Sequence, residues 1–154
     1  MPTIPWRRAL APEPDTEYFV MASRLPLRSM TKVPWFIGLT VSVLRQLERT
    51  DGLVGYSLRA QPLAKTFWTL SAWTDDHALA AFVREMPHVS VMTKLRPHMG
   101  ETRFTTWTFP GSGLPVSWDD AVARLMRPTA SAPPETVIPE VRFPRPPGPG
   151  RPTT

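Results

Sequence analysis

Histidines and aromatic residues are the side chains through which this 154-residue chain could do chemistry, because it contains no cysteine. Without thiols it has no disulfide framework, thiolate zinc site, iron–sulfur cluster or cysteine nucleophile. The spacing of His77, His88 and His98 matches no helical metal motif, and the chain has no phosphate-binding glycine loop and no hydrolase serine motif. A single histidine, or an aromatic surface that binds a small molecule, therefore has to carry any function.

His88 is the main candidate for a general base or a metal ligand. It follows Pro87 and shares a helical stripe with Val91, Met92 and Leu95, so its ring is expected to face the inner, apolar side. An imidazole there could act as acid or base near neutral pH, or ligate haem iron. The alternative is a buried histidine whose ring is satisfied by a backbone carbonyl. The sequence leaves both interpretations open.

A second set of residues could line a binding cavity on the predicted strands. Aromatic side chains could stack on a planar ligand, while hydroxyls and an arginine could orient a carbonyl, phenolate or carboxylate. The alternative is core packing for each aromatic residue, and a salt bridge at the rim for the arginine. The aromatic candidates are Tyr56, Phe67, Trp73 and Trp107, and the polar ones are Thr69, Ser71, Arg103 and Thr105.

Hydrophobic periodicity predicts the elements that position these side chains. The expected strands are 17–25, 53–60, 66–73 and 101–109, and the expected helices are 31–49, 75–86, 88–96 and 118–126. This order is that of an α+β chain with a ferredoxin-like β-α-β-β-α-β arrangement and a four-stranded antiparallel sheet. The first helix is predicted from the stripe Val33, Ile37, Thr40/Val41, Leu44 and Leu47. Thr74 and Ser117 are the expected N-caps of the second and last helices.

The distribution of prolines and charges along the chain predicts where this domain begins and ends and which partners it lacks. The chain has 20 prolines, nine of them among the last 27 residues, and proline does not fit helix interiors or central strands. We therefore expect an irregular arm over 1–16, the α+β domain over 17–126 and a disordered, proline-rich tail over 127–154. The formal charge of +5 comes from singly scattered arginines, which predicts no nucleic-acid surface. The longest uncharged run is too short to span a membrane and no secretory signal is visible, so a cytoplasmic protein is expected.

Both faces of the predicted sheet carry large apolar side chains. Trp68 and Leu70 alternate with Phe67 and Trp73 along one strand, and two helices can cover only one face. The second face then has to meet a partner subunit or a ligand. We expect a homodimer in which two sheets close face to face around a small aromatic-lined cavity.

These segments resemble the dimeric α+β barrel superfamily, which includes antibiotic-biosynthesis monooxygenases and haem-degrading oxygenases. The resemblance is strongest in 67–83 and 87–95 and at Trp107, and it covers roughly 17–126. The stretch 107–125 resembles a stand-alone branch in which a short helix follows the last strand. The resemblance implies a monooxygenase-like homodimer that acts on an aromatic, polycyclic or porphyrin-type ligand, either without a cofactor or with haem. A non-catalytic dimer that binds such a ligand is the alternative.

The resemblance also implies roles for individual residues. His88 would be the base or the iron ligand, with no other metal site, and Arg103 would be the anion partner. In the haem-degrading members the iron ligand is a histidine whose equivalent here is Met92, so any iron at His88 would be bound from one turn earlier. The residues at the opening of the first helix, where such barrels admit ligand, are Trp35 and Phe36.

Overall fold

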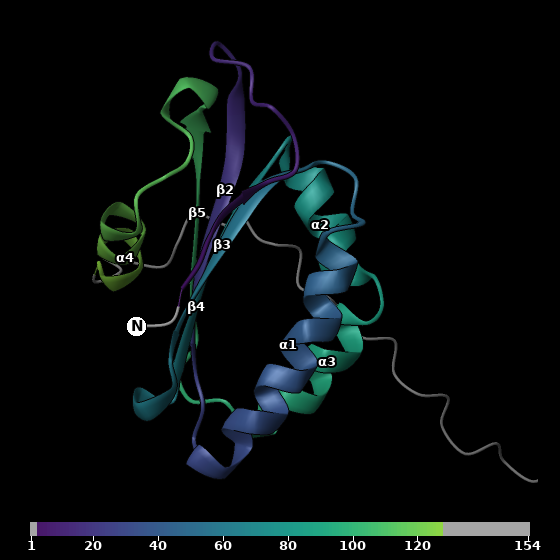
Figure 1. Cartoon of the computed structure of the whole chain (residues 1–154), viewed down its shortest axis with the longest axis vertical. Coiled ribbons are helices and arrows are strands. Elements are labelled where there is room, and N and C mark those ends of the chain that lie inside the picture. Colours follow the sequence, from purple (N-terminus) through teal and green to yellow (C-terminus); the bar gives the residue numbers. More distant parts are fainter. Residues whose placement is uncertain (1–2, 128–154) are drawn as a thin grey trace, which may run out of the picture.

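The computed structural model describes residues 3–127, which form one antiparallel sheet with helices on both faces (Figure 1). The strand order is β1-β3-β4-β2-β5. The strands are β1 (Thr3–Arg8), β2 (Glu17–Pro26), β3 (Leu53–Gln61), β4 (Thr66–Trp73) and β5 (Arg103–Pro110). The last four form the predicted ferredoxin-like core. Apart from Arg127, the tail predicted over 127–154 lies outside the described residues.

The first strand corrects the prediction of an irregular N-terminal arm. β1 pairs antiparallel with β3 at the sheet margin, with Ile4 opposite Leu58 and Arg8 opposite Gly55, and it gives the sheet five strands instead of four. Pro5 is compatible with this strand because β1 is an edge strand, where a missing N–H does not break a ladder on both sides.

The helices are α1 (Val33–Leu47), α2 (Asp76–Arg84), α3 (His88–Leu95) and α4 (Trp118–Met126). The cap of α2 differs from the prediction: Asp75, not Thr74, has the extended N-cap conformation, and its carboxylate accepts from Ala78 N at 2.8 Å. Ser117 caps α4 as predicted. Within residues 3–127, no helix has both the length and the apolar character to cross a membrane.

Helix α1 is rotated relative to the predicted stripe. Val33, Phe36 and Leu47 are buried, whereas Ile37 and Val41 are 47% and 43% exposed. The stripe at 33, 36, 43 and 47 fits the sheet, because Phe36 stacks on Phe67 with ring centroids 4.3 Å apart. A period of three or four residues is compatible with either stripe, so only packing decides between them.

The second face of the sheet is covered by the chain itself. Helices α1, α2 and α3 lie on one face and α4 lies on the other (Figure 1). Ala121 and Leu125 of α4 pack with Val20, Leu70 and Ala72 in a buried cluster. Helix α4 therefore covers part of this face, which the expectation of a partner or ligand there did not take into account, and contact of the rest with a partner stays a prediction.

Candidate functional site

His88 lies at the corner between α2 and α3, with one ring nitrogen committed to the backbone. Its Nδ1 is 3.1 Å from the carbonyl oxygen of Val83, and its ring is 5.0 Å from that of Phe82. Because a carbonyl only accepts, Nδ1 carries the proton, and we assign the free lone pair to Nε2. Burial lowers the pKa of His88, and the hydrogen bond to Val83 partly opposes this shift. The ring therefore remains a neutral base at lower pH than an exposed histidine.

Gln46 of α1 fixes this corner, and sequence reasoning missed it. Its Nε2 donates to the carbonyl oxygen of Phe82 at 3.0 Å, and its Oε1 accepts from the backbone N–H of His88 at 2.9 Å. The side chain thus satisfies an acceptor at the end of α2 and a donor at the start of α3. Gln46 is a polar residue next to the apolar stripe of α1. Its hydrogen-bond partners lie 36 and 42 residues further along the chain, so no local sequence pattern could reveal them.

The space between the sheet and α1–α3 is filled by an aromatic layer. Phe82 is next to Trp73, with ring centroids 5.3 Å apart, and Trp73 is 1% exposed. Trp73 Nε1 donates to Ser71 Oγ at 2.9 Å, and Thr69 is hydrogen-bonded to Ser23. The predicted residues that the structure brings together on this face are Phe36, Tyr56, Phe67, Thr69, Ser71 and Trp73.

The hydroxyl of Tyr56, a polar group of this layer, already has a hydrogen-bond partner in the protein. Its hydroxyl donates to Glu48 Oε1 at 2.9 Å. Burial raises the pKa of Tyr56, and the hydrogen bond to Glu48 and its charge act in the same direction. Tyr56 is therefore a neutral hydrogen-bond donor to protein at neutral pH.

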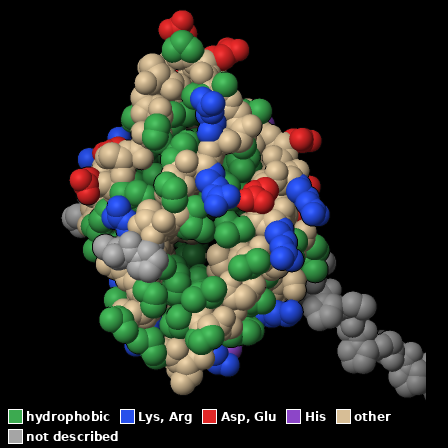
Figure 2. Space-filling view, in the orientation of Figure 1, with side chains coloured by type: hydrophobic (Ala, Val, Ile, Leu, Met, Phe, Trp, Pro, Cys, Tyr) green, Lys and Arg blue, Asp and Glu red, His purple; other side chains and the backbone are tan. Residues whose placement is uncertain are grey.

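A hydrophobic hollow adjoins this layer between α1 and the sheet (Figure 2). Between α1 and the sheet, the partly buried apolar side chains that pack against the core come from both elements: Leu39 and Val43 from α1, Leu58 and Ala60 from β3. At the His88 corner a further surface cavity of about 310 Å³ is lined partly by Gln46 and Pro87.

Arg103, Thr105 and Trp107 lie on the opposite face from His88, which corrects the prediction of one shared cavity. The register pairs them with Arg24, Ala22 and Val20, and the last two belong to the α4 side. Arg103 Nη1 is 3.4 Å from the carbonyl oxygen of Leu125 in α4. The strand patterns predicted which residues alternate, but only the register between strands decides which residues share a face.

Trp35 and Met92 lie at the margins of the helix layer. Trp35 is 36% exposed at the start of α1, with its ring edge-on to His98 at 5.3 Å. Met92 follows His88 by one turn on α3 and is half-buried. Neither residue belongs to the aromatic layer around Trp73.

The residues expected to bind a porphyrin do not come together at His88. The ring of His88 is next to Phe82, and Phe82 is next to the buried Trp73. The arginine predicted as anion partner is on the other face, where it could not pair with a haem propionate. Within residues 3–127, no group of three or more histidine, aspartate or glutamate side chains is placed to hold a metal ion.

Comparison with known proteins supports the fold. No family model and no curated protein matches the chain. Among solved structures, protein SO0527 from Shewanella oneidensis superposes with a TM-score of 0.55 at 11% identity, covering 68% of this chain and 96% of that one. A conserved protein from Methanosarcina mazei Go1 gives 0.53 at 16% identity (58% and 90% covered). A candidate antibiotic biosynthesis monooxygenase from Nitrosomonas europaea gives 0.52 at 15% identity (58% and 95% covered). The chain therefore has the ferredoxin-like α+β fold of antibiotic-biosynthesis-monooxygenase-like proteins.

Proposed function

We propose that the chain is a cofactor-independent, monooxygenase-like enzyme for a phenolic aromatic or polycyclic substrate. The observation that carries this proposal is His88, a neutral imidazole with Nδ1 bonded to Val83 and Nε2 left as an acceptor beside an aromatic layer. The fold likeness to a candidate antibiotic biosynthesis monooxygenase supports the reaction class. The hydrophobic hollow between α1 and the sheet supports an apolar, planar substrate (Figure 2).

The chemistry assigned to the protein is proton transfer and exclusion of water. Nε2 of His88 would remove the proton of a substrate phenol, and the resulting phenolate would give one electron to dioxygen. Recombination of the radical pair at a ring carbon that bears one hydrogen forms a C–O bond, and the peroxide takes back the proton held by His88. Loss of the ring hydrogen and cleavage of the O–O bond then release water and leave a carbonyl. One oxygen atom enters the substrate and the other leaves as water, with the substrate as the only reductant. The aromatic layer keeps this intermediate away from solvent.

A homodimer is the proposed assembly, as the resemblance implies. The partner would add to the α4-side face, where Trp6 and Trp107 remain half-buried beside α4. The main alternative is a dimer that binds the same ligand without a reaction. In this alternative the ligand uses the same hollow and aromatic layer, and the role of His88 is limited to its hydrogen bond with the carbonyl oxygen of Val83.

Oxygen consumption with a polycyclic phenol tests the enzyme proposal. We expect the wild-type protein to consume one dioxygen per substrate, and His88→Gln to lower kcat by about 100-fold or more, the size of a lost general base. His77→Gln is the matched control, because His77 has a 92% exposed side chain. Substrate binding without oxygen uptake would overturn the enzyme and favour the ligand-binding alternative. An absorbance titration with haem tests the cofactor: a Soret shift that is lost in His88→Gln would overturn cofactor independence.

A further inference from the structure

The α4-side face of the sheet ends in a row of arginines. Arg59 on β3 is opposite Trp68 on β4, Trp68 is opposite Arg24 on β2, and Arg24 is opposite Arg103 on β5. Directly opposed residues of an antiparallel sheet project from the same face, with Cβ atoms about 5 Å apart. Three arginines therefore project from one end of this face, with Trp68 between Arg59 and Arg24.

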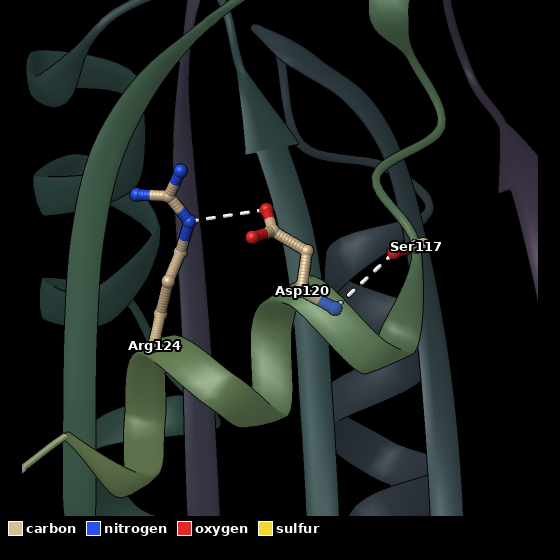
Figure 3. A network of polar contacts seen from close by, with 3 residues as sticks. All are labelled: Ser117, Asp120 and Arg124. Atoms are coloured by element: carbon tan, nitrogen blue, oxygen red, sulfur yellow. Dashed lines mark hydrogen bonds and ion pairs between the residues drawn. The ribbon is translucent and has the colours of Figure 1, made fainter.

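The charges of this row are not balanced by protein carboxylates. Within the described part of the chain, the only carboxylate within 4.0 Å of the row is Glu101, 3.8 Å from Arg103 Nη2, and its side chain is 81% exposed. By contrast, Arg124 of α4 has an ion pair with Asp120 at 3.0 Å, and Asp120 also lies in the N-terminal turn that Ser117 caps (Figure 3). The helix thus satisfies its own arginine, whereas in residues 3–127 Arg24 and Arg59 have no carboxylate within 4.0 Å and Arg103 has only the exposed Glu101.

Two of the row's guanidinium groups are held by aromatic rings. Cζ of Arg24 is 5.7 Å from the Trp68 ring centroid, and Cζ of Arg59 is 4.9 Å from that of Trp118. Such contacts stabilise the cation through its face and leave the N–H groups along its edge available as donors. Nε of Arg59 is buried and has no hydrogen-bond partner in residues 3–127. The side chains of Arg24 and Arg59 are therefore held by aromatic rings, and the buried Nε of Arg59 has no acceptor among the described residues.

Like charges in opposed positions destabilise a sheet, and half-burial removes part of their hydration. A bound oxyanion offsets the repulsion with its negative charge and replaces the lost water as a hydrogen-bond acceptor. The paired N–H donors of an arginine guanidinium match the two oxygens of a carboxylate or phosphate. Arg24 and Arg103 are on adjacent strands, so one anionic group can contact both. Arg59 lies beyond Trp68, about 10 Å further along the row at two strand spacings, and can bind a second group.

We propose that Arg24, Arg103 and Arg59 form a binding site for a small molecule with at least two oxyanion groups, carboxylate or phosphate. The site is separated from His88 by the sheet. It therefore does not depend on the proposed oxygenase activity, and either proposal can fail alone.

Calorimetric titration of the full chain tests the site, with inorganic tripolyphosphate and citrate as probes at about 0.15 M ionic strength. We expect at least one probe to bind, and Arg24→Gln, Arg59→Gln and Arg103→Gln each to weaken its binding about tenfold, because each removes charge-assisted hydrogen bonds. Arg84→Gln is the matched control: Arg84 ends α2 on the far side of the sheet, and its change removes the same charge. Binding of tripolyphosphate alone identifies phosphate as the ligand group, and binding of citrate alone identifies carboxylate.

Two results would overturn the site. The first is that neither probe binds the wild-type chain. The second is that Arg84→Gln weakens binding as much as the row variants do, which would reduce the effect to net charge. Arg24→Lys keeps the charge but loses the fork, so it should bind more weakly than wild type. It also provides a folded reference if a glutamine variant fails to fold.

Discussion

The two faces of the sheet differ in how they treat polar groups. On the α1–α3 face the hydroxyls and ring donors are used inside the protein: Trp73 donates to Ser71, Tyr56 to Glu48, and Ser23 bonds Thr69. On the α4 face, Arg59 Nε and Trp107 Nε1 are buried without a partner in residues 3–127. The first face is a packed interior in which, among residues 3–127, Nε2 of His88 is left as an acceptor. The second face is a cationic surface that α4 covers only in part. Buried polar groups without a hydrogen-bond partner in a folded chain indicate a place for a ligand or a partner.

Removing the largest aromatic side chain from each face tests this difference most strongly. Trp73 is 1% exposed on the α1–α3 face, so Trp73→Ala is expected to lower the free energy of unfolding by about 3–5 kcal/mol. Trp107→Ala on the half-buried α4 face is the matched comparison, and it should lower the free energy of unfolding by clearly less. Urea unfolding at equilibrium measures both. Equal losses would mean that the two faces are packed equally well.

Leu125→Ala tests how firmly α4 covers its face. Leu125 is 4% exposed in the cluster with Val20 and Leu70, so we expect a loss of about 2–4 kcal/mol. Hydrogen exchange should increase in 118–126 before it increases in α1, because the variant loosens only one face. Met126→Ala is the control, since Met126 is 50% exposed. Uniform exchange over the whole chain would contradict separate layers.

Ser117→Ala tests the cap of the same helix. Ser117 Oγ accepts from Asp120 N at 3.2 Å, and loss of an N-cap costs about 1 kcal/mol. Thermal unfolding should show a Tm lowered by several degrees, while Ser117→Asp should restore most of it. Ser112→Ala, at an exposed position of the preceding turn, should leave the Tm unchanged.

The smallest expected effect is the pH dependence caused by His88. Its pKa is lowered in the folded chain, so the unfolded chain binds the proton more readily. Stability should therefore be greatest above the ordinary histidine pKa of about 6.5 and should decline as the pH falls through it towards the folded pKa. His88→Gln should remove this part of the pH dependence of Tm, whereas His77→Gln should leave it. A Tm that rises on acidification through this range would show that the ring gains, not loses, a proton on folding.

Local sequence patterns predicted the elements well, and the faces less well. Strand 66–73 and helix 118–126 have the predicted bounds, because an alternating run and a capped amphipathic run are complete local signals. β1 was missed because the strand with which it pairs, β3, lies about 50 residues further along the chain, and Pro5 is typical of a non-strand segment. His88 could be chosen from its stripe, but its partner Gln46 could not. The position of Arg103 depended on register, which no pattern within one strand contains.

Ser57 on β3 joins the two segments that lie outside the ferredoxin-like core. Its hydroxyl donates to the carbonyl oxygen of Ile4 in β1 at 2.7 Å and accepts from Trp118 Nε1 in α4 at 3.0 Å. β1 and α4 come from opposite ends of the described chain, yet both form a hydrogen bond with the same hydroxyl. For anyone engineering this protein, the consequence is that shortening either segment disturbs the anchor of the other, so the two additions should be kept or removed together.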